Sequence, residues 1–188
     1  MRAAMGNPLQ DRRTPQDFAA SGQVIEISEK IGSFEKLAGI VEADLGALEP
    51  DKLPRDWREL PVAGQLGFGF VDAQRGVPAL EGQVVATINA VCQRCLEPFR
   101  LPLEVELRLL FSGDQSAGDD DNGYEVWELQ EDELCPADLI EEALIMAMPY
   151  SAKHADNAQC VAADKNEKGK GEIVRPFANL KSQMEEEN

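Results

Sequence analysis

Two long stretches of alternating apolar and polar residues, 78–91 and 100–111, constrain the fold of this chain more than any other feature. In the second stretch, apolar side chains recur at every other position from Leu101 to Leu109. A period of two is typical of a strand with one buried face and one solvent-facing side. Because only a short turn separates the two stretches, we predict that they pair as an antiparallel hairpin.

The turn of this hairpin contains two cysteines, Cys92 and Cys95, separated by two residues. Such a pair can share one metal ion or form one disulfide. A second short segment, which begins at His154 and ends at Cys160, contributes an imidazole and a third thiol. Three thiols and one imidazole are a donor set typical of tetrahedral structural zinc. We therefore predict a zinc site formed by Cys92, Cys95, His154 and Cys160.

Other interpretations of these cysteines stay open at this point. Cys92 and Cys95 also suit a tight turn as small residues, with His154 on the surface. A redox pair is disfavoured, because thioredoxin-type motifs stand at a helix N-terminus, whereas predicted strands flank this turn. Arg94 nevertheless keeps that interpretation open, since a cation lowers the pKa of a neighbouring thiol. Cys135 directly precedes a predicted helix, and we expect a buried small residue there rather than a ligand.

The remaining segments complete the predicted secondary structure. We predict further strands over 23–28, 62–71 and 124–129, helices over 31–41 and 136–148, and loops over 45–59, 72–76 and 112–123. Pro136 favours a helix start, since its missing N–H is not needed there, and Pro149 ends that helix. The predicted fold class is α+β. It comprises a strongly bent, barrel-like meander of antiparallel strands with the helix over 136–148 packed on it.

The chain is predicted to have one folded domain between two tails. Its 188 residues correspond to a single domain of ordinary size. We expect a flexible N-terminal segment over 1–20 and the α+β domain over 21–160. Residues 161–188 are predicted to form a linker and a short amphipathic C-terminal helix, a flexible tail on the domain. Because 43% of the residues are hydrophobic and only 6% aromatic, the core should be mostly aliphatic.

Charge and hydropathy narrow the classes of function. No apolar run reaches the ~20 residues that a membrane helix needs, so we expect a cytoplasmic protein with no membrane contact. The formal net charge is −17, from 35 acidic and 18 basic residues, which weighs against a simple nucleic-acid binder. Residues 109–152 contain twelve acidic residues and no Lys or Arg. This region predicts attraction to basic proteins, the alternative being a solvated acidic loop that maintains solubility.

Three arginines near the cysteine pair are candidate phosphate contacts. Arg94 lies in the turn, and Arg100 and Arg108 follow on the outgoing strand. On a strand, residues at even spacing point the same way, so these side chains can form a narrow basic stripe. Ordinary outward-facing charge is the alternative. Tyr124 and Trp127 are candidates for stacking on bases, with burial in the core as the alternative.

The order of several motifs resembles the bacterial YceD family. The motifs are Cys92-Gln-Arg-Cys-Leu-Glu-Pro-Phe99, an acidic stretch, the segment from Asp138 to Pro149, the pair His154 and Cys160, and Arg175-Pro-Phe-Ala-Asn-Leu-Lys181. The resemblance extends from about residue 22 to about residue 181. It implies a role in the accumulation of the large-subunit ribosomal RNA, and it supplies no established catalytic residues.

We therefore expect a non-enzymatic ribosome biogenesis factor that supports synthesis, processing or stability of 23S ribosomal RNA. The expected partner is a basic ribosomal protein or a pre-50S assembly particle, with RNA contact secondary. No catalytic constellation is evident, since His154 is the single histidine and no glycine-rich phosphate loop is present. The alternative class is a metal-dependent or thiol-dependent enzyme of rRNA maturation.

Overall fold

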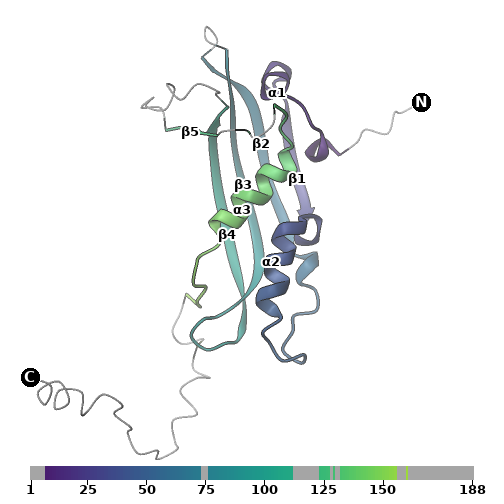
Figure 1. The fold of residues 1–188 in the computed structure, drawn as a ribbon, viewed down its shortest axis with the longest axis vertical. Coiled ribbons are helices and arrows are strands. Elements are labelled where there is room, and N and C mark those ends of the chain that lie inside the picture. The colour runs from purple at the N-terminus through teal and green to yellow at the C-terminus, as the bar shows by residue number, and fades with distance from the viewer. Residues whose placement is uncertain are drawn as a thin grey trace, which may run out of the picture.

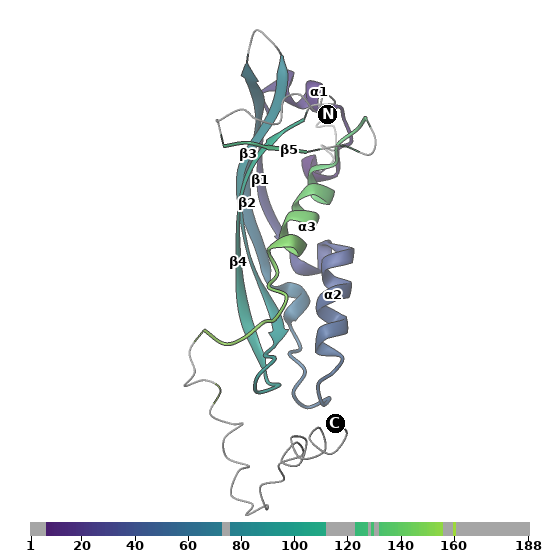
Figure 2. The same ribbon diagram turned by 60° about the vertical axis from the view of Figure 1, so that its left-hand side comes forward.

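The computed structural model describes residues 7–72, 76–111, 123–127, 129, 132–155 and 160. The strands are β1 (Val24–Lys30), β2 (Pro61–Asp72), β3 (Val77–Val91), β4 (Pro98–Leu110) and β5 (Glu125–Val126). The α-helices are α1 (Pro15–Ser21), α2 (Glu35–Leu45) and α3 (Pro136–Ala147), and short 3-10 turns are η1 (Pro8–Gln10), η2 (Ile31–Ser33) and η3 (Trp57–Glu59). The strands form one sheet in the order β1-β2-β3-β4-β5, and the helices cover one of its faces (Figures 1 and 2).

The predicted hairpin is confirmed and forms the centre of the sheet. β3 and β4 pair antiparallel without interruption, from Ala79 opposite Leu110 to Val91 opposite Pro98. Side chains at alternate positions point to the helix-covered face, which we call the inner face. Its large buried side chains on the two strands, all at most 6% exposed, are Leu80, Val84, Ile88, Leu103, Leu107 and Leu109. The period-two pattern therefore identified the correct buried face of β4.

The α+β class is confirmed, but the barrel-like form of the sheet is not. β1, β2, β3 and β4 pair antiparallel as expected, whereas the two-residue strand β5 runs parallel to β4. Among the described residues the sheet is open, with β1 and β5 at its two ends. The physical reason is that α2 and α3 fill the inner face with buried side chains (Figure 2). These helices take the place of the opposite wall of a barrel.

Two glycines let β2 and β3 approach each other closely. A Cβ atom built on Gly64 would lie 2.1 Å from the carbonyl oxygen of Gln83. One built on Gly82 would lie 2.6 Å from the carbonyl oxygen of Gln65. At both positions a backbone carbonyl of the neighbouring strand occupies the space that a side chain would need. Neither position therefore accepts a larger residue without a shift of the strand. The long strands curve along their length (Figure 1), in keeping with the prediction of a strongly bent sheet.

Within the N-terminal segment over 1–20, which was predicted to be flexible, the structure places η1 and most of α1. Thr14 caps α1 by accepting a hydrogen bond from the backbone N–H of Asp17, and Gly22 ends the helix in the left-handed conformation. Phe18 of this helix is fully buried and stacks on Phe68 of β2. Arg13 also pairs with Leu134 through backbone hydrogen bonds. This helix was not predicted because the segment contains few apolar residues. It is held by one buried aromatic side chain and by its two caps.

The two longer helices follow the predicted positions and are locked together by a buried carboxylate. α3 begins at Pro136 as predicted, while α2 begins and ends later than the predicted 31–41, because residues 31–33 form a 3-10 turn and the helix continues to Leu45. Glu141 of α3 is 6% exposed and accepts hydrogen bonds from the backbone N–H groups of Lys36 (2.7 Å) and Leu37 (3.1 Å). It therefore caps the first turn of α2. The predicted acidic loop (apart from Gly123) and the predicted C-terminal linker and helix lie outside the described residues.

Candidate metal centre

Cys92 and Cys95 stand on a compact turn where β3 passes into β4. The backbone N–H of Cys92 donates to the carbonyl of Glu97 (3.0 Å), and that of Leu96 donates to the carbonyl of Cys92 (2.8 Å). We call this turn, residues 92–97, the knuckle. Because both hydrogen bonds close the turn on itself, the two thiols are presented on the same side of a rigid loop. The knuckle position was predicted from the sequence and is confirmed.

The second half of the cluster comes from the chain that follows α3. This segment descends alongside β4 to the knuckle (Figure 1), where the carbonyl of Ala152 accepts a hydrogen bond from the backbone N–H of Gln93 (2.9 Å). The imidazole of His154 lies beside the ring of Phe99, with centroids 4.6 Å apart. These two contacts place His154 against the knuckle. They were not predicted, since backbone pairing and ring contacts between distant segments leave no pattern in one sequence.

The four predicted ligands converge, with their ligating atoms within 4.8 Å of one another. The Sγ atoms of Cys92 and Cys160 are 3.7 Å apart. The Nδ1 atom of His154 lies 3.6 Å from the Sγ atom of Cys95 and 3.2 Å from that of Cys160. Tetrahedral zinc with Zn–S ≈ 2.3 Å and Zn–N ≈ 2.0 Å requires separations of about 3.8 Å between sulfurs and about 3.5 Å between sulfur and nitrogen. The cluster can therefore hold a metal ion.

Hydrogen bonding to Cys92 favours the thiolate that a metal requires. Burial of this fully enclosed thiol raises its pKa, but backbone N–H groups of Cys95, Arg94 and His154 outweigh burial and lower the pKa to about 5. At Cys95 burial dominates and raises the pKa, with further contributions from the thiols of Cys92 and Cys160. Negative charge in this cluster thus accumulates at Cys92 first, and a bound cation would offset the repulsion that opposes further ionisation.

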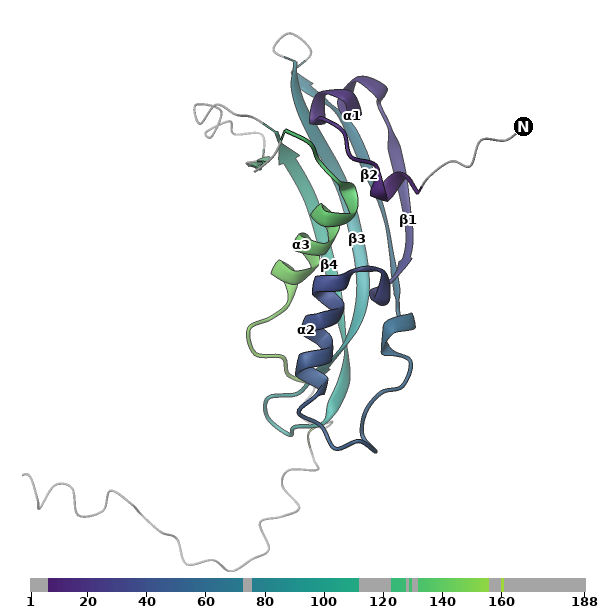
Figure 3. The same cartoon turned by 45° about the vertical axis from the view of Figure 1, so that its right-hand side comes forward.

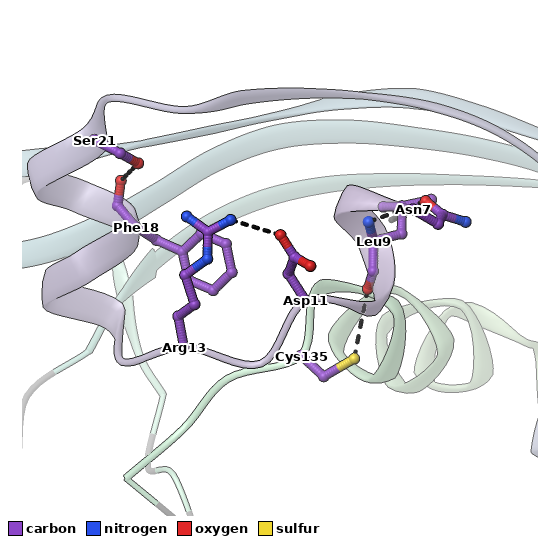
Figure 4. Close-up of polar contacts among 7 residues, drawn as sticks. All are labelled: Asn7, Leu9, Asp11, Arg13, Phe18, Ser21 and Cys135. Atoms are coloured by element: carbon purple, nitrogen blue, oxygen red, sulfur yellow. Dashed lines mark hydrogen bonds and ion pairs between the residues drawn. The ribbon is translucent and has the colours of Figure 1, made fainter. Parts of the chain in front are cut away.

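Cys135, the one cysteine that is not in the cluster, stands apart from it. It is 5% exposed, and its thiol donates to the carbonyl oxygen of Leu9 at 3.5 Å (Figure 4). The thiol thereby fixes η1 against the start of α3. The expectation of a buried small residue at this position is confirmed.

The three predicted phosphate-contacting arginines do not form one compact patch. Arg100 and Arg108 lie on the exposed face of β4 as expected, eight residues and thus about 26 Å apart. Arg108 stacks over the ring of Tyr124, 4.8 Å from its centroid, at the end of the sheet opposite the knuckle. Tyr124 is half-buried and donates its hydroxyl to Glu81, which raises the pKa of Tyr124. Nucleic-acid binding by Arg94, Arg100 and Arg108 stays a prediction.

Further polar contacts that sequence reasoning missed anchor the knuckle to neighbouring elements. Asp44, near the end of α2, accepts a hydrogen bond from the backbone N–H of Val91 at 2.7 Å. The Nζ atom of Lys52 donates to the carboxylate of Glu97 at 2.8 Å. Both contacts connect residues more than forty positions apart. The metal cluster is thus braced by α2 and by the loop that follows it.

A family model described as large ribosomal RNA subunit accumulation protein YceD matches residues 80–182, which is more than half of the chain. The chain belongs to the YceD family. The matched region contains all four residues of the ligand cluster. Comparisons with curated proteins and with solved structures gave no match.

The description of the family associates it with accumulation of large-subunit ribosomal RNA. Among the described residues, no helix combines the length and the hydropathy needed to cross a membrane.

Proposed function

We propose that this chain is a non-enzymatic cytoplasmic factor of ribosome biogenesis that supports synthesis, processing or stability of 23S ribosomal RNA. We further propose that it acts by binding a basic ribosomal protein or a pre-50S particle. The observation that carries the proposal is the family match over residues 80–182. The net charge of −17 supports a basic partner, because it opposes close approach to RNA phosphates.

The proposed metal is zinc, in a structural role. Three thiols and an imidazole match the ligands of structural zinc sites, and carboxylates and carbonyls, which suit magnesium or calcium, are absent from the cluster. All four protein ligands would be used, so no position would stay open for a substrate. The proposed zinc would join the β3–β4 hairpin to the segment after α3.

The same geometry argues against the enzymatic alternative. The single histidine, His154, lies in the ligand cluster, where a bound metal would take up the ring nitrogen needed for proton transfer. Cys92 is fully buried and stands at a strand end, whereas redox-active pairs are accessible and stand at helix N-termini. A cleavage assay on precursor rRNA with added divalent metal tests this alternative directly, and we expect no cleavage.

The decisive experiment for the proposed function is capture of pre-50S material by the tagged full-length chain. Lysate should be divided, with one half treated with ribonuclease, and both halves analysed for ribosomal proteins and for precursor and mature 23S rRNA. Retention of specific ribosomal proteins after ribonuclease supports binding through protein. Loss of all ribosomal material after ribonuclease would show that RNA is the primary partner, and no enrichment in either half would contradict the proposed function.

A further inference from the structure

The face of the sheet that is turned away from the helices carries an open groove. Among the described residues, no helix covers this outer face (Figures 2 and 3). One hollow of about 510 Å³ crosses β1, β2 and β3, and a second of about 310 Å³ continues from it to Tyr124. Because the two hollows share Gly67 and Glu81, they form one depression, which we call the outer groove.

Two glycines of β2 form part of the groove, and the fold itself does not require them. Neither Gly67 nor Gly69 has a positive φ. A Cβ atom built on Gly67 would lie 3.7 Å from the carbonyl oxygen of Glu81, an ordinary contact, and one built on Gly69 would meet nothing within 4 Å. Gly64 and Gly82, in contrast, have no room for a side chain. A glycine inside a strand weakens it, and it often marks a place where a ligand or another chain approaches closely.

Exposed apolar side chains line the groove beside these glycines. Val24 of β1 and Val85 of β3 line the first hollow and are 58% and 43% exposed. Phe70 lines the second hollow and is 41% exposed. The solvated face of an antiparallel sheet normally carries polar side chains. A partner that covered the groove would remove this apolar surface from water.

Carboxylates outnumber bases around the groove. Four of them either line it or stand directly opposite a lining residue on the neighbouring strand, namely Glu26, Glu81, Glu104 and Glu106. The one base in such a position is Arg108, whose guanidinium stacks over the ring of Tyr124. Lys30 and Arg100 lie further along the sheet toward the knuckle, and Lys30 is ion-paired with Glu59. The groove is therefore more negative than the face as a whole.

Apolar walls, a glycine floor and surrounding carboxylates together fit lysine and arginine side chains. The aliphatic stem of such a side chain packs on apolar surface while its charged end stays at the polar rim. Here Val24 and Val85 would contact the stem, and Glu81 or Glu106 would receive the cation. RNA phosphates and anionic lipids would be repelled by the same carboxylates, and so would the outer groove of a second copy of this chain.

We propose that the outer groove binds a lysine- or arginine-rich segment of a protein partner. The inference rests on the proposed function, in which the chain binds a basic ribosomal protein or a pre-50S particle, and it deepens that function by assigning the contact surface. Gly67 and Gly69 reduce the stability of β2 in this arrangement, but they leave the space that the basic segment occupies.

Filling the groove separates binding from stability. Gly67→Val and Gly69→Val each add a branched side chain to the groove without changing the net charge. Because valine suits a strand better than glycine, both variants should melt at the temperature of the wild type or higher. Their association with purified pre-50S particles should weaken about tenfold or more, as for a change at the centre of an interface. Wild-type binding by both variants would overturn the proposal.

Gly39 provides the matched control for these variants. It is exposed in α2, and a Cβ atom built on it would meet nothing within 4 Å. Gly39→Ala should therefore also keep or raise the melting temperature, but it should bind pre-50S particles as the wild type does. If Gly39→Ala weakens association as much as Gly67→Val, the loss is not specific to the groove and the proposal fails.

The contribution of charge is tested with two substitutions that each remove one negative charge. Glu106→Gln lies at the groove, whereas Glu133→Gln lies outside it on an exposed residue before α3. Glu106→Gln alone should slow association at low salt by about threefold, and the difference should shrink as salt is raised. Equal effects of the two substitutions would show that only the overall charge of the chain matters, which would overturn the assignment to this groove.

The class of partner is decided by amide chemical shifts of the whole chain. The probes are a decalysine peptide and, separately, a decauridylate RNA. The proposal expects decalysine to shift the signals of Gly67, Gly69 and Gln83, and expects these shifts to be lost in Gly67→Val. Shifts at these residues with decauridylate, or decalysine shifts confined to other segments, would overturn it. If the wild type fails to associate with pre-50S particles, the proposed function fails, whereas the decalysine shifts still decide whether the groove binds a basic segment.

Discussion

The two ends of the sheet are held by different kinds of interaction. At the end far from the knuckle, α1 covers the sheet with Phe18, whose ring stacks on Phe68 with centroids 4.5 Å apart. At the knuckle end, three thiols and an imidazole converge within 4.8 Å, and polar contacts join the surrounding loops in addition to the buried side chains of α2, such as Val41 and Leu45. The first end is therefore held mainly by burial of apolar surface, whereas the second combines buried side chains with the converging ligand atoms.

This difference predicts that order at the two ends depends on different conditions. Burial of aromatic surface requires no added component and is nearly independent of metal. In the proposed zinc site, the thiols can ionise together only when a cation offsets their mutual repulsion, so the stability of this end should depend on metal. The end around α1 should therefore stay folded under conditions that loosen the knuckle. Each of the following predictions tests one part of this contrast.

The largest effect is expected at Cys92. Serine is a poor zinc ligand, and Cys92→Ser would leave a buried hydroxyl where a thiolate accepts backbone hydrogen bonds. We expect loss of bound zinc and a decrease in the free energy of unfolding by about 4 kcal/mol or more, in the range of exceptional single-site effects. Zinc analysis of protein purified without added metal, combined with urea denaturation, measures both.

The control for Cys92 is Cys135→Ser, since Cys135 is also buried but is not part of the cluster. Serine can still donate to the carbonyl of Leu9. Because Cys135 lies outside the cluster, the zinc content of Cys135→Ser should be unchanged.

In the wild type, chelator should accelerate amide hydrogen exchange at Gln93 and Leu96 before it affects Phe68, whose N–H donates to Gln23. Equal zinc content in wild type and Cys92→Ser would show that Cys92 is not a ligand, and absence of zinc from both would show that the thiols only fill space.

The next largest effect is expected at Phe18. Removing this fully buried ring should lower the free energy of unfolding by about 3–5 kcal/mol, because a cavity replaces the contact with Phe68. Zinc content of Phe18→Ala should stay at the wild-type level, which is the opposite of the result expected at Cys92. A loss below about 1 kcal/mol would mean that α1 is peripheral and that the far end of the sheet is organised in another way.

A smaller effect is expected between the two ends, where Glu141 joins α3 to α2. Glu141→Ala leaves the buried N–H groups of Lys36 and Leu37 without their acceptor, so we expect a loss of about 1–3 kcal/mol. Glu142→Ala is the matched control, since Glu142 is half exposed and lies 4.0 Å from Lys36. That variant should change stability by about 0–1 kcal/mol. Equal effects at both positions would contradict a capping role for Glu141.

The sequence predicts those parts of the molecule that are governed by local pattern. The alternation from Leu101 to Leu109 identified the buried face of β4, and Pro136 identified the start of α3. The ligand cluster was also predictable, because thiols and imidazoles are rare in this chain and their chemistry restricts their arrangement. These signals are carried by residue type and spacing alone.

Contacts between distant segments could not be predicted in the same way. Nothing in the local sequence indicates that Glu141 caps another helix or that Asp44 accepts from the end of β3. The order of residues 7–20 depends on one aromatic side chain whose partner, Phe68, lies fifty positions away. The open sheet likewise results from how two helices fill its inner face, which is a property of the assembled fold.

The smallest effect is expected from an exposed ion pair at the far end. Arg12 lies 3.0 Å from Asp138 where the N-terminal segment meets α3, and the two side chains are 56% and 52% exposed. Water and salt screen such a pair, so Arg12→Ala should change the free energy of unfolding by about 0–1 kcal/mol.

Raising salt to about 1 M, where the Debye length is ~3 Å, should remove even this difference between Arg12→Ala and the wild type. Parallel denaturation curves at low and high salt measure it. If Arg12→Ala instead loses more than about 2 kcal/mol and the loss disappears in salt, the N-terminal segment is positioned by charge. The end of the sheet around α1 would then be held by charge rather than by burial, which contradicts the contrast between the two ends. If the loss stays small in both conditions, burial of Phe18 is sufficient to hold α1 on the sheet.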